Sequence, residues 1–219
     1  MLQRDYFMRI TEMLTAALVK ILFNKENKNF DEAEKEIETA AKTIAGFDFK
    51  LIALLGEDDV VALAKTSEPY AGRCIVGAEL LKEYGDILTG KQKPEAAINV
   101  YKKSLHLYIE AQLSKELPSP EEYQPRIDFL IKNLSQTGLS PTVRTKLIDY
   151  FEMTGRFAKA EDVIFELIDE KAEGIEKKAV SFYNRLRQKP DEELVKGNLT
   201  RKELDESLEE VQFKLNKNS

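Results

Sequence analysis

Residue types that often carry catalysis or metal binding are scarce in this chain. His106 is its only histidine and Cys74 its only cysteine among 219 residues. A single imidazole and a single thiol exclude a multi-histidine metal site, a cysteine-rich zinc site and a disulfide within the chain. The sequence also shows nothing that would complete a hydrolytic triad with His106. We therefore interpret His106 as a surface or packed structural residue.

The one thiol is flanked by a cation. Arg73 precedes Cys74, and it would lower the pKa of the thiol if its side chain turned toward the sulfur. Free cysteine, however, is among the most buried residue types in proteins. A buried and inert Cys74 is the preferred interpretation.

Acidic clusters invite comparison with metal sites, but helix chemistry explains them. Most lie where helices are expected to begin, where acids complement the helix dipole. Di-iron helical bundles require Glu-x-x-His pairs, and the chain has none. Its ten glycines are scattered singly and form no phosphate-binding loop. We expect no cofactor, no metal and no catalytic activity; the acidic clusters lie at positions 57–59, 121–122, 191–193 and 209–210.

The composition is typical of a helical protein that does not bind nucleic acid. Charged residues make up 33% of the chain and hydrophobic residues 42%, a balance found in soluble helical proteins. A net charge of −6 opposes general binding to phosphates, which leaves only a local basic patch for such contacts. The chain has no run of eighteen apolar residues and no signal-peptide pattern, so we expect no membrane span. Together with the single cysteine, this predicts a cytoplasmic protein.

The elements that must position any site are predicted to be helices, and three of them share a pattern. Ala33, Ala97 and Ala160 lie 64 and then 63 residues apart. In each helix a large apolar residue follows four positions later, and a small or apolar one seven positions later. Such a stripe lets a neighbouring helix approach closely, as in the second helix of a helix–turn–helix repeat. The following residues are Ile37 and Ala40, Tyr101 and Ser104, and Ile164 and Leu167.

Periodicity and capping signals predict an all-α chain throughout. Thr200 and Glu203 form a capping box, and Leu199 and Leu204 occupy the positions of a hydrophobic staple. The last helix is therefore expected to be docked through about residue 216. The expected helices cover 2–23, 30–45, two short runs between 47 and 66, 68–88, 95–116, 121–133, 141–155, a segment from 157, 174–188 and this last helix.

The middle pattern resembles the tetratricopeptide repeat. A frame that begins at Ala78 matches, or nearly matches, each usual position of the repeat, with Leu81 where Trp is frequent and Ile109 where Pro is frequent. The third copy, framed from Pro141, has Ile148 where the repeat has glycine, and the first copy matches only in its second helix. The matching residues are Leu81, Tyr84, Gly85, Leu88, Ala97, Tyr101 and Ser104 in the middle copy and Leu147, Phe151, Ala160, Ile164 and Leu167 in the third.

This resemblance implies an architecture. Antiparallel helix pairs would stack as a right-handed α-α superhelix of degenerate repeats. Residues 1–219 would form a single domain of this kind. Pro118 and Pro120 make the segment 117–120 the candidate hinge between 1–116 and 121–219, because each proline disfavours helix in the residue before it.

The resemblance also implies a binding surface, because the first helix of each tetratricopeptide pair lines a concave groove. The carboxylate clamp of that family uses Lys and Asn, whereas Asp86 and Asp149 stand where Asn would be. The groove is therefore expected to suit a helix or a basic amphipathic segment better than an acidic peptide terminus. The groove positions are Glu79, Lys82, Asp86, Thr89 and Gly90 in the middle copy and Thr142, Thr145, Asp149, Glu152 and Met153 in the third.

A second resemblance covers most of the chain. The first ten residues and the segment Asp-Glu-Glu-Leu-x-x-Gly-Asn-Leu-Thr at 191–200 look like an uncharacterised bacterial family, a domain of unknown function. This resemblance implies a bacterial, cytoplasmic protein and no particular chemistry.

Three functions follow from these observations. The preferred hypothesis is a non-catalytic cytoplasmic helical-repeat scaffold that binds a protein or peptide in its groove. The alternative is a self-associating structural protein in which an end helix forms a homodimer contact, the stripe of the last helix being Leu204, Leu208, Val211 and Leu215. An all-helical enzyme of unknown reaction is the third. The first helix has a charge-balanced polar face, which favours packing over membrane binding.

Overall fold

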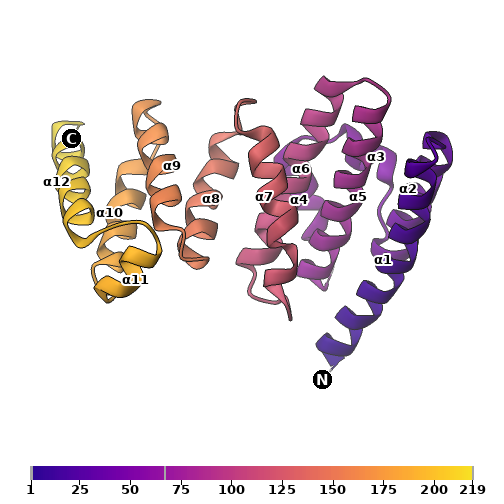
Figure 1. Cartoon of the computed structure of the whole chain (residues 1–219), viewed down its shortest axis with the longest axis horizontal. Coiled ribbons are helices and arrows are strands. Elements are labelled where there is room, and N and C mark those ends of the chain that lie inside the picture. The colour runs from indigo at the N-terminus through magenta and orange to yellow at the C-terminus, as the bar shows by residue number, and fades with distance from the viewer. Residues whose placement is uncertain (1, 67, 219) are drawn as a thin grey trace. The chain divides into compact units, whose positions relative to one another are not determined.

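The computed structural model describes residues 2–66 and 68–218, with side chains for 5–66 and 68–214, and these residues form helices and connecting segments without a strand. The all-α class predicted from periodicity is confirmed. The chain divides into two compact units, Met1–Gly138 and Leu139–Ser219. Each is described by itself below (Figure 1).

The first unit contains two long helix pairs and the short helices between and after them. α5 packs against α6, α2, α1 and α4, and α7 packs against α6. The helices are α1 (Leu2–Glu26), α2 (Phe30–Ala45), α3 (Phe49–Leu54), α4 (Glu57–Ala64), α5 (Tyr70–Gly90), α6 (Pro94–Leu113), the 3-10 helix η1 (Pro120–Tyr123) and α7 (Gln124–Leu134).

The core of this unit is centred on α5, which is buried along most of its length. Two of its glycines allow α6 to come close. A Cβ atom at Gly85 would lie 2.3 Å from Cε1 of Tyr101, and one at Gly77 would lie 2.8 Å from Cδ1 of Leu107. Both distances are shorter than van der Waals contact, so side chains at these positions would separate the helices.

The three patterned alanines lie in the core, as their spacing predicts. Ala33 on α2 and Ala97 on α6 are buried in the first unit, and Ala160 is buried in the second. Two of their helices begin at the predicted residues, Phe30 and Phe157, and the third begins at Pro94, one residue before the predicted start. The small side chains therefore lie at helix contacts and not in solvent.

The second unit is a series of helices in which sequence neighbours pack together. α8 packs against α9, α9 against α10, and α10 against α12. The capping box predicted for the last helix is present, because the backbone N–H of Thr200 donates to Glu203 at 2.8 Å. The helices are α8 (Pro141–Met153), α9 (Phe157–Asp169), α10 (Ile175–Leu186), α11 (Asp191–Lys196) and α12 (Arg201–Asn218).

The apolar stripe of the last helix, which the alternative hypothesis assigned to a dimer contact, packs within the chain. Leu204, Leu208 and Val211 are buried, and their helix packs against α10. The side chain of Leu215 lies outside the described residues. The last helix is therefore docked, as predicted, and a homodimer contact through it stays a prediction.

Some boundaries differ from those predicted. α1 continues to Glu26 and α6 ends at Leu113, three residues from the predicted ends, and the short α11 after Pro190 was not predicted. The proline segment at 117–120 lies inside the first unit, where Gln112 Nε2 donates to the carbonyl of Pro120 at 2.7 Å. The two units divide later, between Gly138 and Leu139. A hinge at 117–120 stays a prediction.

Candidate functional site

An ionic cluster surrounds the α5 residues that were predicted to line a groove. Its members, called here the α5 cluster, are Lys25, Lys82, Glu83, Asp86 and Tyr101. Lys25 of α1 donates from Nζ to Glu83 and, at 2.6 Å, to Asp86. Lys82 donates to Glu83 and to Asp86, each at 2.9 Å. The hydroxyl of Tyr101 on α6 donates to Asp86 at 2.8 Å.

Three helices bring these side chains together. Lys82 and Asp86 are four residues apart on α5 and therefore lie on one face. Lys25 occupies the last turn of α1, where a cation complements the helix dipole. Tyr101 reaches the cluster because its ring packs over Gly85. Thr89 lies beside it, with Oγ1 3.5 Å from the hydroxyl of Tyr101.

The cluster is electrically balanced, with two ammonium groups and two carboxylates in mutual contact. Burial raises the pKa of Asp86, but hydrogen bonds from Lys25 and Lys82 lower it by more, so its pKa lies below the ordinary value. Burial lowers the pKa of Lys82, and Glu83 and Asp86 raise it by more, so its pKa lies above the ordinary value. Asp86 and Lys82 are therefore each stabilised in the ionised form by their partners.

An exposed aromatic ring borders the α5 cluster. Phe129 of α7 is 42% exposed. The ammonium of Lys82 lies 5.6 Å from the centroid of this ring, within the range of a cation–π contact. The ring of Tyr101 packs edge-on against the same ring at 6.2 Å. The surface next to Lys82 is thus partly apolar.

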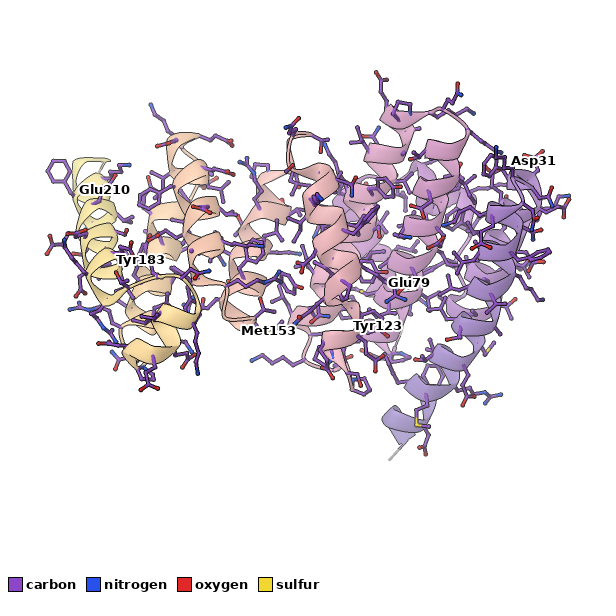
Figure 2. All side chains as sticks on the ribbon, in the orientation of Figure 1. Asp31, Glu79, Tyr123, Met153, Tyr183 and Glu210 are labelled. Carbon is purple, nitrogen blue, oxygen red and sulfur yellow. The ribbon has the colours of Figure 1, made fainter. Side chains whose placement is uncertain are left out.

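Glu79, predicted to face an open groove, is instead buried. Only 3% of the residue is exposed, and its carboxylate pairs with the guanidinium of Arg126 on α7 at 2.8 Å. Burial raises the pKa of Glu79 above its ordinary value, although Arg126 acts in the opposite direction. Figure 2 shows the positions of Glu79 on α5 and of Tyr123 at the end of η1. Glu79 therefore does not face an open groove, because its carboxylate is buried and pairs with Arg126 of α7.

The predicted groove residues of the second unit are also paired. Asp149 of α8 accepts from Lys178 of α10 at 2.6 Å. Glu152 accepts two hydrogen bonds from Arg185 of α10, both at 2.7 Å. Of the remaining predicted positions, Thr142 is exposed and Thr145 is half-buried.

One rule relates both units: an acid on one helix meets a base on another helix of the same unit. The structure joins α1 to α5, α5 to α7 and α8 to α10 in this way. Sequence reasoning found the acids and missed the bases. For α8 and α10 the sequence does indicate the pairing. Lys178 and Arg185 are seven residues apart on one predicted helix and therefore share a face. The missed residues are Lys25, Arg126, Lys178 and Arg185.

The lone histidine and the lone cysteine lie near α4, α5 and α6, and both are buried. The ring nitrogens of His106 lie 3.7 Å from carboxylate oxygens of Asp58 and Glu110. Glu110 also accepts a hydrogen bond from Tyr70. Burial raises the pKa of the Cys74 thiol to about 12. The thiol therefore stays protonated at neutral pH and is a weak nucleophile, as the preferred interpretation of Cys74 anticipated.

Two further kinds of site are absent from the part of the chain that the structure describes. No group of three or more His, Cys, Asp or Glu side chains there is placed to hold a metal ion. None of its helices combines the length and the apolar character that crossing a bilayer requires.

A family model matches nearly the whole chain. It is the family described as a family of unknown function, DUF6483, and the match covers residues 1–216. No curated protein shows significant similarity to the chain. No solved structure does so either.

Proposed function

From the premise that this chain belongs to the DUF6483 family, whose function is unknown, we propose that it is a non-catalytic helical scaffold that binds a protein or peptide segment. We place its binding surface on the first unit, around Lys82, Asp86, Thr89 and Phe129. We further propose that it acts in a bacterial cytoplasm.

The observation that carries this proposal is the position of Phe129. Its ring is 42% exposed and lies directly beside Lys82, whose charge belongs to the α5 cluster. An apolar anchor with a polar border is the usual composition of a protein-binding hot spot. Rigid surroundings add to this role, because the cluster holds α1, α5 and α6 together.

The pairing of charges limits what the surface binds. Lys25 and Lys82 already contact carboxylates, so they are poorly suited to clamp the free carboxylate of a peptide terminus. An amphipathic segment that places an apolar side chain on Phe129 and polar side chains toward Thr89 and Asp86 fits better. In the second unit, taken by itself, Met153 on α8 is 42% exposed and follows the paired Glu152.

We also propose that the helix pairs stack as degenerate tetratricopeptide-like repeats in a right-handed superhelix. The burial of Ala33, Ala97 and Ala160 supports this arrangement. So does the contact of Gly85 with Tyr101, which are the glycine and aromatic positions of the middle repeat. An experimental structure in which the pairs α1–α2 and α5–α6 stack with the opposite hand would contradict it.

Affinity capture from the native host tests the binding surface. Phe129→Ser removes the anchor and, because the ring is half-exposed, leaves the core intact. We expect this variant and the charge reversal Lys82→Glu/Asp86→Lys to lose one specific partner that the wild type retains. Circular dichroism checks that each variant is folded.

A matched control distinguishes specific binding at this surface from nonspecific adhesion to an exposed aromatic ring. Phe213 on α12 is 70% exposed, so Phe213→Ser removes an exposed ring of the same type from another helix. We expect it to keep the partner. Identical partner sets for wild type, Phe129→Ser and the charge reversal would exclude this surface as the binding site.

A further inference from the structure

A hollow lies between the first half of α1 and the segment that joins α6 to α7. Its volume is about 310 Å³, at the lower end of the range of ligand-binding pockets. Phe7 and Met8 line it from α1, and Pro118 and Tyr123 line it from the connecting segment; Tyr123 is labelled in Figure 2. The hollow therefore offers apolar and aromatic surface to a side chain that enters it.

Both sides of this hollow are held by contacts with the core of the first unit. On the α1 side, Gly72 of α5 lets the helix approach closely, because a Cβ atom there would lie 3.1 Å from Cδ1 of Ile10. On the other side Tyr123 is buried, and Gln112 of α6 donates to the carbonyl of Pro120. The hollow is thus largely formed before anything binds, which lowers the entropy cost of binding.

The charged side chains that line the hollow are both acidic. Glu12 of α1 and Glu122 of η1 are exposed, and none of the described residues that line the hollow is basic. Neither carboxylate has an ion-pair partner among the described residues. Arg126 follows Glu122 by one helical turn, but its guanidinium pairs with Glu79. The hollow therefore departs from the acid–base pairing of the other helices, because it presents two carboxylates and no base.

Arginine has the chemistry that fits this hollow. Its stem covers apolar surface, and its planar guanidinium stacks on aromatic rings such as those of Phe7 and Tyr123. Its five N–H donors can satisfy two carboxylates at once. Free arginine fits less well than arginine within a peptide chain, because its own carboxylate would be repelled by Glu12 and Glu122. The net charge of −6 also attracts a cationic segment.

We propose that this hollow binds an arginine side chain of a partner protein, with its stem against the apolar lining and its guanidinium paired with Glu12 and Glu122. This is a second contact, with lining residues different from those around Lys82 and Phe129. It rests on the proposed function only in taking the occupant to be a protein segment.

A nuclear magnetic resonance titration of the full chain tests the proposal. The probe is the blocked peptide acetyl-Leu-Arg-Leu-amide. Its control is the same peptide with citrulline, which keeps the shape of arginine and removes the charge. We expect the arginine peptide to shift the backbone amide signals of Ser119 and Tyr123 and to bind about tenfold more tightly than the control. Equal binding of both peptides, or no shift of these signals at millimolar peptide, would overturn the proposal.

Three single substitutions locate the binding residues. Glu12→Gln and Glu122→Gln each remove one carboxylate from the hollow, and each should weaken binding of the arginine peptide by about threefold or more. Glu121→Gln is the matched control, because Glu121 is exposed beside Glu122 but does not line the hollow, and it should leave the affinity unchanged. Equal weakening by Glu121→Gln and Glu122→Gln would assign the effect to net charge and refute the site.

The variant Phe129→Ser separates this proposal from the proposed function. Phe129 does not line the hollow, so we expect Phe129→Ser to bind the arginine peptide as tightly as the wild type. Loss of peptide binding in this variant would place the peptide on the other surface and overturn the hollow as its site. A peptide that does not bind the wild type overturns the hollow alone and leaves a partner captured through Phe129 unaffected.

Discussion

A single carboxylate shows how neighbours decide what a residue can do. Glu79 lies on α5 one turn before Lys82, which is partly exposed, yet Glu79 itself is buried against Arg126. Burial penalises its ionised form more than Arg126 stabilises it, so its pKa is raised. The residue contributes to the contact between α5 and α7 and is not available to a ligand.

The first prediction concerns this residue. We expect Glu79→Gln to keep or raise the free energy of unfolding at neutral pH. The pKa of Glu79 is higher in the folded chain than the ordinary 4.5, so the folded state binds the proton more tightly. Its contribution to stability is then largest below that ordinary pKa and falls as pH rises through the folded pKa. Glutamine removes this fall, which urea unfolding from acid to neutral pH measures.

The control for this prediction is the partner residue. Arg126→Gln leaves the ionised Glu79 buried without its cation and should lower the free energy of unfolding by roughly 1–3 kcal/mol at neutral pH. If Glu79→Gln proves as destabilising as Arg126→Gln, the carboxylate is a net source of stability and its raised pKa is refuted.

At the scale of elements, the close contact between α5 and α6 depends on the absence of a Cβ atom at Gly85. Gly85→Ala would place a Cβ atom 2.3 Å from Tyr101 Cε1 and 2.6 Å from its Cδ1. We expect a loss of about 1–3 kcal/mol in the free energy of unfolding, because the helices must separate or the ring must move. Chemical denaturation measures this loss. Tyr101→Leu made in the Gly85→Ala background should cost less than Tyr101→Leu in the wild type, and additive losses would mean that the two residues do not interact.

Helices were predictable from sequence where local signals agreed. α2 has an apolar period and a glycine stop at Gly46, α8 has Ser140 and Pro141 at its start, and α12 has its capping box; all three begin where predicted. α11 was not predicted, because six residues are too few for a helical period to appear. Local chemistry therefore determined which segments are helices, and less strongly where each one ends.

At the scale of the whole molecule, the division into two compact units predicts separable stability. Gly85→Ala lies in Met1–Gly138, whereas Thr200→Ala removes the helix cap of α12 in Leu139–Ser219. We expect hydrogen exchange to rise mainly in the first unit for the former variant and mainly in the second for the latter. Mass spectrometry of peptides from both units checks this. A uniform rise across the chain in either variant would show that the units unfold together.

The candidate site was only half predictable at this scale. Lys82 and Asp86 were named as groove positions from the tetratricopeptide resemblance, and the structure places them in the α5 cluster. Lys25 is 58 residues from Glu83, and no local pattern links residues so distant. The same holds for Arg126 and Glu79, and this contact changed a predicted groove residue into a buried one.

The sequence by itself determined the helical class, the buried alanines at 33, 97 and 160 and the capped last helix, because periodicity, small residues and caps act over one or two helical turns. Tertiary structure alone decided which charges meet, whether Glu79 faces solvent and which end helix keeps an uncovered apolar face. The physical reason is that burial and ion pairing depend on neighbours from distant parts of the chain. The stripe of α12 and the residues Val19 and Phe23 of α1 are all apolar in sequence, and only packing shows that the stripe is covered and that these two residues are exposed.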